Sequence, residues 1–221
     1  MPLFFQLQID EHTQLAVWKI EEEEAFFLKK VPLQRAITHP HKRLQHLAGR
    51  YLLQYLFPEF PIDLIKIADT RKPFLEDEAF HFSISHCAHF AAAIVSKEKR
   101  VGVDIEVVST KIEKVQHKFS SIEEMKCINV SWLHQKETFT TENTSTIHAT
   151  QLTFLWSCKE AIFKWFGAGG VAFKENILLQ KIKQNETDLI QSTFCFKKEA
   201  ETTLRLQSYF FEDAVLSYVI T

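Results

Sequence analysis

The sequence predicts a mixed fold that contains both α-helices and β-strands. Residues 41–57 and 151–167 repeat apolar side chains every three to four positions, which is typical of an amphipathic helix. Residues 79–85 and 101–106 alternate apolar and polar side chains, and residues 89–95 form an apolar run, so these three segments are predicted as strands. With 221 residues the chain can bury a core as one large domain or as two small ones.

The N-terminal part is predicted as one strand followed by two helices. FFQLQI at residues 4–9 has a strand pattern, and residues 13–30 are predicted as an amphipathic helix. The outer face of that helix would carry Glu21–Glu24. A solvated face explains these acids better than a metal site, because consecutive helical residues point in different directions. Residues 41–57 form the second helix, which Pro58 ends, and its apolar stripe consists of Leu44, Leu47, Leu52 and Leu56.

The three central strands are expected to be neighbours in one sheet. In the first of them, Phe80, Phe82 and Ile84 would face one side and His81, Ser83 and Ser85 the other. Only the charged turn Lys97–Arg100 separates the second strand from the third. This arrangement would bring the polar pair Ser85 and His86 close to Asp104 and Glu106.

The C-terminal half is predicted to contain a loop, a helix and a β-hairpin. Residues 129–150 are polar and rich in threonine, which favours an irregular loop. Residues 151–167 form the helix, with Gly167 as its C-cap. Residues 204–221 alternate apolar and polar side chains and are predicted as a hairpin. The buried stripe of the helix is expected at Leu155, Cys158, Ile162 and Trp165 or Phe166.

Composition and charge exclude several functional classes. The formal net charge of −2 gives no global basic field for nucleic acid, so an anionic ligand must be held by a local cluster. The 4 cysteines include no CxxC pair, which argues against a disulfide framework or a zinc ribbon and for a reducing compartment. The first residues lack the pattern of a signal peptide, and no apolar run reaches the ~20 residues of a membrane span. A cytoplasmic protein without a membrane partner is therefore expected.

Two acids share one face of the strand VGVDIE. Asp104 and Glu106 are two residues apart, so their Cα atoms would lie ~6–7 Å from each other and their charges would repel. A hard divalent cation such as Mg²⁺ would relieve this repulsion. Solvent-exposed acids on an edge strand would give the same pattern. On the helix 151–167, Glu160 and Lys164 form either an ordinary i,i+4 surface ion pair or, through Glu160, a third carboxylate for the metal.

A phosphate pocket could be built from basic and polar residues in the first half of the chain. Pro73 fixes the backbone after Arg71 and Lys72. The second helix carries Lys42, Arg43, His46 and Arg50 on its surface, outside the apolar stripe. The candidates for the pocket are Lys72, Arg71, Arg43, Arg50, Ser85 and His86. The chain has neither a P-loop nor a GxGxxG motif, and GAGG at residues 167–170 is interpreted as a cap and turn.

Two other chemistries receive little support from the sequence. His81, His86 and His89 suggest zinc, but the strand period places His81 and His86 on opposite faces and a second ligand cluster is not evident. Cys87 and Cys158 have apolar neighbours, which indicates buried thiols and not nucleophiles.

Three blocks in this order resemble the surfactin-type 4'-phosphopantetheinyl transferases. The blocks are RKPFLEDEAFHFSISH at residues 71–86, VGVDIE at residues 101–106 and FLWSCKEAIFKWFG at residues 154–167. Members of that family carry a lysine-proline followed by F-N-[IL]-S-H, then G-[IV]-D-[IL]-E, then W-[ST]-x-K-E-[AS]-x-x-K. Position 83 departs from the pattern, because Ser83 stands where the family often has Asn.

The resemblance implies an α+β fold, arranged as a pseudo-dimer of two similar lobes with coenzyme A in the cleft between them. The N-terminal lobe would span residues 1–100 and the C-terminal lobe residues 101–221. A single chain with two lobes implies a monomer. The reaction would move phosphopantetheine from coenzyme A to a serine of an apo acyl or peptidyl carrier protein and release 3',5'-ADP.

The resemblance also assigns roles to the candidate residues. Asp104, Glu106 and Glu160 would bind Mg²⁺, or Mn²⁺ in its place, and Asp104 would also contact coenzyme A through the metal. Lys164 would contact the phosphates, and Glu160 or a water on the metal would take the serine proton. The adenosine 3'-phosphate end would be held by Lys72, Pro73, Ser85 and His86, with Arg43 and Arg50 from the basic helix.

Some assignments stay open at this point. The register of the phosphate-contacting residue in the basic helix is ambiguous among Lys42, Arg43 and Gln45. KFSSIEEMKCI at residues 118–128 resembles a family segment that would place Glu123 or Glu124 near the metal, and residues 129–150 would meet the carrier protein. Two alternatives to the transferase are an inactive coenzyme A-binding module of the same fold and a Mg²⁺-dependent phosphoesterase that acts on coenzyme A.

Overall fold

The computed structural model describes residues 3–128, 144–184, 189–211 and 213–221. The fold is of the α+β class, and the chain divides into two compact units. The first unit consists of the chain up to Ile105 together with Lys164–Ala168 and Thr221, and the second consists of Glu106–Phe163 and Gly169–Ile220. The predicted lobe limits, residues 1–100 and 101–221, stay a prediction.

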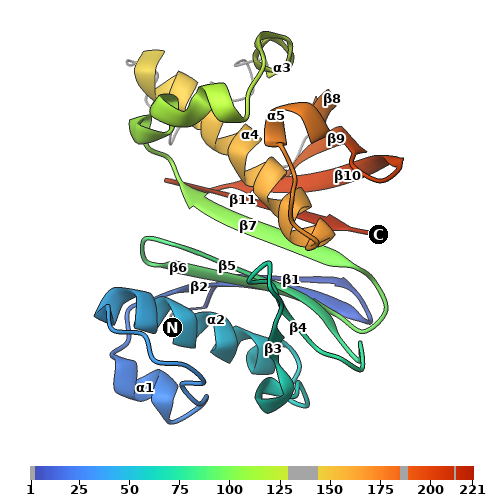
Figure 1. Cartoon of the computed structure of the whole chain (residues 1–221). Coiled ribbons are helices and arrows are strands. Elements are labelled where there is room, and N and C mark those ends of the chain that lie inside the picture. Colours follow the sequence, from blue (N-terminus) through green and yellow to red (C-terminus); the bar gives the residue numbers. More distant parts are fainter. Residues whose placement is uncertain (1–2, 129–143, 185–188, 212) are drawn as a thin grey trace. The chain divides into compact units, whose positions relative to one another are not determined.

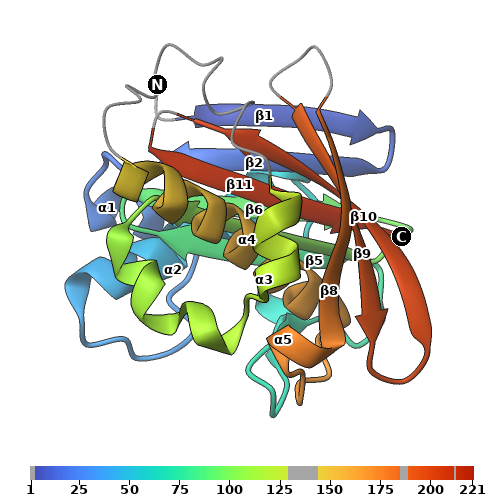
Figure 2. The same cartoon turned by 90° about the horizontal axis from the view of Figure 1, so that it is seen from above.

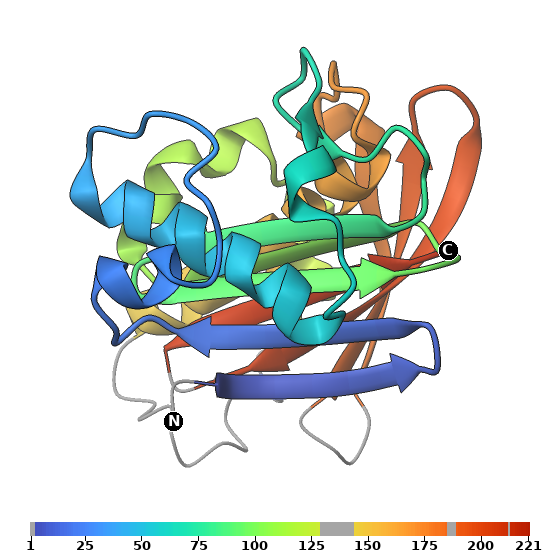
Figure 3. The same ribbon diagram turned by 90° about the horizontal axis from the view of Figure 1, so that it is seen from below.

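The first unit is built on a four-stranded antiparallel sheet in the order β1-β2-β6-β5. Helix α2 packs against this sheet, and the short helix α1 packs against α2 (Figure 3). The two-stranded pair β3 and β4 and the turn η1 complete the unit. The bounds are β1 Leu3–Asp10, β2 Thr13–Lys19, α1 Glu24–Leu28, α2 Pro40–Leu56, η1 Ile62–Leu64, β3 Lys66–Ile67, β4 Pro73–Phe74, β5 His81–Cys87 and β6 Phe90–Ser96.

The prediction of a helix over residues 13–30 is wrong. Thr13–Lys19 is a strand that forms a hairpin with β1 and also pairs with β6, and only Glu24–Leu28 is helical. The helical spacing of apolar residues is overridden because both edges of this strand find hydrogen-bond partners. The strands predicted at residues 4–9, 79–85 and 89–95 are confirmed as β1, β5 and β6, as is the helix α2.

The core of the first unit lies between α2 and the sheet. Leu47, Leu52 and Leu53 are fully buried, and each such side chain contributes roughly 1.5–3 kcal/mol. Gly49 allows this close approach, because a Cβ there would lie 2.6 Å from Ile84 Cγ2 on β5. Arg50, predicted on the surface of the helix, is only 4% exposed.

Strand β7 (Val101–Val107) carries the chain from the first unit into the second (Figure 1). The strand itself was predicted correctly, but the expectation that it is a sheet neighbour of β5 and β6 is wrong. It belongs to the five-stranded sheet in the order β7-β11-β10-β9-β8. Its link to β5 uses a side chain, because the Val103 backbone N–H donates to Ser83 Oγ at 3.2 Å.

Helix α4 lies across the sheet of the second unit (Figure 2). Cys158 on this helix contacts Ser192 on β9, Ser208 on β10 and Ser217 on β11, all of them buried. The predicted C-terminal hairpin is confirmed as β10 and β11. The bounds are η2 Thr110–Lys118, α3 Ile122–Cys127, α4 Thr144–Phe166, α5 Phe173–Asn176, β8 Ile177–Gln184, β9 Leu189–Lys197, β10 Glu201–Phe210 and β11 Ala214–Ile220.

The predicted loop over residues 129–150 is corrected in part. Residues 144–150 form the first turns of α4, and residues 129–143 lie outside the described part of the chain. Gly167, the predicted C-cap, has a φ of +74°, which lets the chain leave the helix in a left-handed conformation. None of the described helices combines the length and the apolar character needed to cross a membrane.

Candidate active site

Three predicted site residues meet in the first unit. Lys164 Nζ donates to Asp104 Oδ1 at 2.6 Å and to Ser85 Oγ at 2.8 Å. Ser85 Oγ in turn donates to Asp104 Oδ1 at 2.8 Å. The three side chains come from β5, β7 and α4, and so from the three separate sequence blocks. We call this trio the lysine–aspartate–serine cluster.

The cluster combines a buried acid with a lysine that solvent can reach. The Asp104 side chain is 2% exposed, whereas that of Lys164 is 26% exposed. Burying a carboxylate is costly unless it is paired and hydrogen-bonded, and the two donors meet this requirement at Oδ1. An ammonium group with one open side can also contact a second anion such as a phosphate.

A second feature of the first unit is a buried guanidinium group on α2. The Nε and Nη1 atoms of Arg50 have no hydrogen-bond partner within the described residues. Burial, with a smaller contribution from the charge of Arg35, lowers the pKa of Arg50 to about 10. A buried charge without an acceptor is costly, so this site is suited to bind an anion.

The positive field extends from Arg50 along α2 to β5. The pKa of His46 is lowered to about 4, first by burial and then by the charges of Arg50, Arg35 and His86. The pKa of His86 is also lowered, chiefly by desolvation and further by Lys42 and Lys164. These mutual repulsions identify one continuous basic cluster in the first unit. It consists of Arg35, Lys42, His46, Arg50, His86 and Lys164.

The other predicted coenzyme A-binding residues have protein partners. Arg43 donates from Nε to Glu24 Oε1 at 2.7 Å and from Nη1 to the Ile37 carbonyl at 2.9 Å. Lys72 Nζ donates to the Trp165 carbonyl at 3.3 Å. Burial and the nearby charge of Arg100 lower the pKa of Lys72 to about 8.

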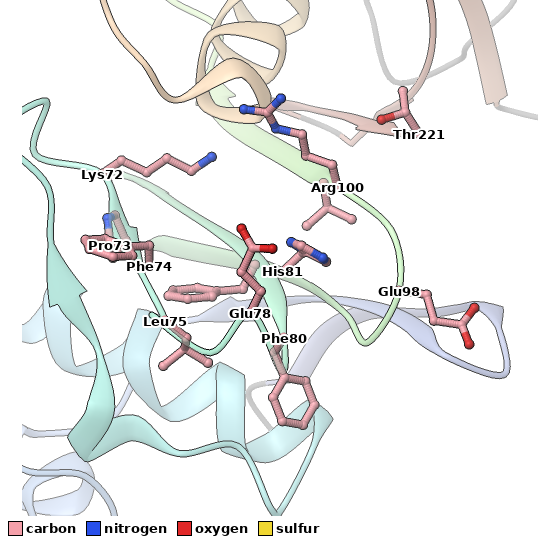
Figure 4. Close-up of a pocket in the computed structure, with 12 residues that line it drawn as sticks. Lys72, Pro73, Phe74, Leu75, Glu78, Phe80, His81, Glu98, Arg100 and Thr221 are labelled. Carbon is pink, nitrogen blue, oxygen red and sulfur yellow. The ribbon is translucent and has the colours of Figure 1, made fainter.

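Lys72 and Pro73 also line a pocket of about 550 Å³ in the first unit (Figure 4). Figure 4 shows the Lys72 and Arg100 side chains pointing toward each other at one end of this pocket. His81 and Glu78 lie at its centre. The pocket therefore presents cations at one end and a mixed lining elsewhere.

The remaining two predicted metal ligands lie in the second unit. Trp156 Nε1 donates to Glu106 Oε1 at 3.3 Å, which places Glu106 beside α4. Glu160 follows Trp156 by one helical turn and is half-buried. It lines a pocket of about 930 Å³ whose walls are mainly apolar. The aromatic side chains of this pocket are Trp156, Phe163 and Phe173.

The donor set of Asp104, Glu106 and Glu160 is made of carboxylate oxygens, the ligands that Mg²⁺ prefers. Among the described residues, however, no three His, Cys, Asp or Glu side chains are grouped so that they could hold a metal ion. Asp104 binds the Lys164 ammonium group instead. The chemistry of the donors fits a magnesium ion, and their role as ligands stays a prediction.

The family model of the 4'-phosphopantetheinyl transferase superfamily matches residues 100–219, more than half of the chain. The chain belongs to this superfamily. The match includes Asp104, Glu106, Glu160 and Lys164. The resemblance predicted from the three sequence blocks is thereby confirmed at the level of the superfamily.

Curated relatives of this superfamily member carry the name enterobactin synthase component D. The protein from Salmonella austin is 30% identical over 125 residues, which are 57% of this chain and 48% of the relative. The protein from Salmonella typhi is 32% identical over 126 residues, again 57% and 48% of the two chains. The chain thus spans about half the length of the curated relatives that it matches.

The sequence interpretation missed one ion pair of this superfamily member. Lys159 Nζ contacts Glu124 Oε1 at 2.8 Å, and both side chains are buried. Glu124 caps α3 through a capping box with Ser121, so it stabilises the local fold, and its expected place near a metal stays a prediction. The S-x-x-E spacing of residues 121–124 was a signal for this cap. Nothing in the sequence pointed to Lys159 as its partner.

Proposed function

We propose that the chain transfers 4'-phosphopantetheine from coenzyme A to a serine of an apo acyl or peptidyl carrier protein. The serine hydroxyl oxygen would attack the β-phosphorus of coenzyme A. A new phosphorus–oxygen bond would form as the bridging bond of the pyrophosphate breaks. The leaving 3',5'-ADP would keep the electron pair of that bond, and the serine proton would pass to Glu160.

One observation carries this proposal: Lys164 contacts buried Asp104 and Ser85 within a chain of this superfamily. The negative charge that develops on the leaving phosphate needs a preorganised cation. Lys164 is partly exposed and is held at a fixed place by two acceptors, so it can supply this charge with little reorganisation. Asp104 would hold the amine in this orientation.

The adenosine end of coenzyme A would bind the basic cluster. Its 3'-phosphate can accept hydrogen bonds from the Nε and Nη1 atoms of Arg50, which have no partner in the described structure. His46 and His86 add donors next to it. We include Lys72, Pro73, Ser85 and Arg43 in the proposed coenzyme A site on the strength of the family resemblance.

The acceptor side of the reaction would be formed by Glu160 and the apolar pocket next to it. A carboxylate within reach of the serine hydroxyl can act as a general base. The aromatic wall of Trp156, Phe163 and Phe173 offers an apolar surface for the incoming chain and excludes water. Lys118, which also lines this pocket, would add a positive charge for an acidic partner.

Asp104, Glu106 and Glu160 are the proposed ligands of Mg²⁺, with Mn²⁺ as a substitute. When bound, the ion would neutralise part of the pyrophosphate charge. Glu106 is kept beside α4 by Trp156, and Glu160 lies one turn farther along that helix. Asp104 and Glu106, two residues apart on β7, would each supply carboxylate oxygens to the ion.

Three finer parts of the proposal follow from the family resemblance. The two lobes would form a pseudo-dimer that binds coenzyme A between them, the protein would be a cytoplasmic monomer, and it would belong to the surfactin-type branch. Light scattering of the purified chain tests the monomer. A mass equal to two chains would contradict it.

The decisive experiment is intact-mass spectrometry of apo carrier proteins incubated with the chain, coenzyme A and Mg²⁺. A mass gain equal to one phosphopantetheine is expected, and it should disappear with EDTA or with Glu160→Gln. Free phosphopantetheine without carrier modification would instead indicate a phosphoesterase. Tight coenzyme A binding without any product, across several carrier proteins, would indicate a binding module.

A further inference from the structure

The C-terminal end of α4 is fastened by side chains of the first unit. A helix leaves its last carbonyl groups without intrahelical partners, and these must find other donors. Three side chains supply them. Thr70 Oγ1 donates to the Gly167 carbonyl at 2.9 Å, Lys72 Nζ to the Trp165 carbonyl at 3.3 Å, and Arg100 Nη2 to the Phe166 carbonyl.

Arg100 makes the most extensive contacts of the three. Its guanidinium group lies over the Trp165 ring at 4.9 Å from the centroid, in addition to its hydrogen bond to Phe166. Its backbone N–H and carbonyl each form a 3.0 Å hydrogen bond with the backbone of Thr221. A planar guanidinium can stack on an aromatic ring and donate in its own plane at the same time, which an ammonium group cannot do.

Trp165 closes these contacts into a ring. Its indole Nε1 donates to Thr221 Oγ1 at 2.9 Å. Arg100, Trp165 and Thr221 therefore contact one another pairwise, and we call them the arginine–tryptophan–threonine ring. Figure 4 shows Arg100 between Lys72 and Thr221 at the end of the pocket.

Residues of the ring lie close in sequence to residues of the lysine–aspartate–serine cluster, both on α4 and at β7. Lys164 precedes Trp165 on α4, and Arg100 precedes β7, the strand that carries Asp104. The last turn of α4 is thus attached to one segment of chain at two points, through Lys164 at Asp104 and through Trp165 and Phe166 at Arg100. Two attachments prevent the turn from rotating about the helix axis, which one attachment alone would not do.

We infer that Arg100 is a positioning residue for Lys164: through Trp165 and Phe166 it holds the last turn of α4 so that the lysine amine stays on Asp104 and Ser85. This inference rests on the proposed function, in which Lys164 acts on the phosphates. Without Arg100 the hydrogen bond to the Phe166 carbonyl and the stacked guanidinium on Trp165 are lost, and the final turn opens locally.

The test combines lysine labelling with kinetics on the full chain. A short pulse of an N-hydroxysuccinimide acetate, read by peptide mass spectrometry, gives the acetylation rate of each lysine. In Arg100→Gln the rate at Lys164 is expected to rise about 5-fold as the turn opens locally. Buried Lys159 reports global loosening and exposed Lys66 reports reagent activity, so both rates should stay at the wild-type level.

Two further variants complete the design. Arg100→Lys keeps the charge but not the planar guanidinium group, and should give an intermediate acetylation rate at Lys164. Arg205→Gln removes an exposed arginine of β10 and should change nothing. In the transferase assay, kcat of Arg100→Gln should fall about 10-fold through misplacement of Lys164, while KM for coenzyme A changes less than about 2-fold.

The outcomes separate this inference from the proposed function. Labelling of Lys164 that does not respond to Arg100→Gln would overturn the inference, as would a parallel rise at Lys159 or an unchanged kcat. A wild-type chain that modifies no carrier protein would contradict the proposed function. If Lys164 labelling still rose in that case, the assignment of Arg100 as the residue that holds Lys164 would stand.

Discussion

Helix α4 carries two lysines five residues apart, and each binds a buried acid in a different way. In the second unit, Lys159 is fully buried, and its ammonium group contacts Glu124 and the carbonyls of Phe119 and Phe173. In the first unit, Lys164 contacts Asp104 and Ser85 and keeps 26% of its side chain exposed. The first amine is saturated by protein groups, and the second can accept a further partner.

The acid of the Lys159 pair, Glu124, is also held by several protein groups. Glu124 accepts from Lys159 and also from the backbone N–H groups of Leu179 at 2.9 Å and Ser121 at 3.0 Å. It thereby ties α3 and β8 to α4. A pair of this kind supports the fold, and its burial lowers the pKa of Lys159. An ion pair alone does not identify an active site, whereas a pair that leaves one side of the cation accessible is suited to bind substrate.

The largest expected effect comes from breaking the buried ion pair between Lys159 and Glu124. Lys159→Met leaves the Glu124 carboxylate buried without its cation, so the free energy of unfolding should fall by about 3–5 kcal/mol. Urea denaturation of the variant measures this change. The double variant Lys159→Met with Glu124→Gln removes the charge and should recover part of the loss. Equal stability of the single variant and the wild type would contradict a structural role.

Breaking the partly exposed ion pair between Lys164 and Asp104 should affect the reaction more than the fold. Lys164→Met removes the cation proposed for the leaving phosphate, so the transfer rate should fall by at least about 100-fold. The loss of stability should be smaller than for Lys159→Met, because solvent can reach the vacated position. Urea denaturation and a single-turnover assay give the two quantities. A variant that unfolds like Lys159→Met would remove the distinction between the two pairs.

Arg50 offers a further contrast, since its buried Nε and Nη1 atoms have no hydrogen-bond partner among the described residues, whereas the Lys159 ammonium group has several. Arg50→Met should weaken binding of 3',5'-ADP by about 10- to 100-fold, as expected for lost charged hydrogen bonds. The same variant should raise the free energy of unfolding of the unliganded protein by about 1 kcal/mol, since an uncompensated buried charge is removed. Calorimetry and urea denaturation measure the two effects. A destabilised variant that binds normally would contradict the anion site.

The smallest expected effect is a pH dependence at His46. Its pKa is about 4 in the folded protein against an ordinary value of 6.5, so the unfolded chain binds more protons between these limits. The free energy of unfolding should therefore decrease as the pH falls from about 6.5 to about 4. His46→Gln should make that decrease shallower, while the lowered pKa of His86 leaves part of it in place. Denaturation at a series of pH values tests this, and an unchanged slope would contradict it.

The sequence predicted those parts of the site that depend on local spacing. The i,i+4 spacing placed Glu160 and Lys164 on one helix. Ser85 and Asp104 do lie close together as predicted, but the sheet pairing from which this was predicted is wrong, and the two residues meet through their side chains. The family resemblance joined these blocks into one site. The same reasoning predicted α2 and the C-terminal hairpin.

Features that depend on long-range partners were not predictable in this way. Thr13–Lys19 has a helical spacing of apolar residues but becomes a strand because β1 and β6 pair with it. Arg50 shares its helix with exposed Lys42 and half-buried Arg43, and only the packing of α2 on the sheet buries it. The partners Lys159 and Glu124 are 35 residues apart, and no local pattern connects them.

The most direct test of the account is the rate at which a single coenzyme A-derived phosphopantetheine is added to an apo carrier protein, followed by intact mass under single-turnover conditions. Lys66→Met removes an exposed lysine of β3 that pairs with Glu76 and not with the lysine–aspartate–serine cluster. This variant and the wild type should react at the same rate. Lys164→Met, folded under the same conditions, should be at least about 100-fold slower. Transfer by Lys164→Met at the wild-type rate would contradict the central claim that the open lysine–aspartate–serine cluster acts on the phosphate.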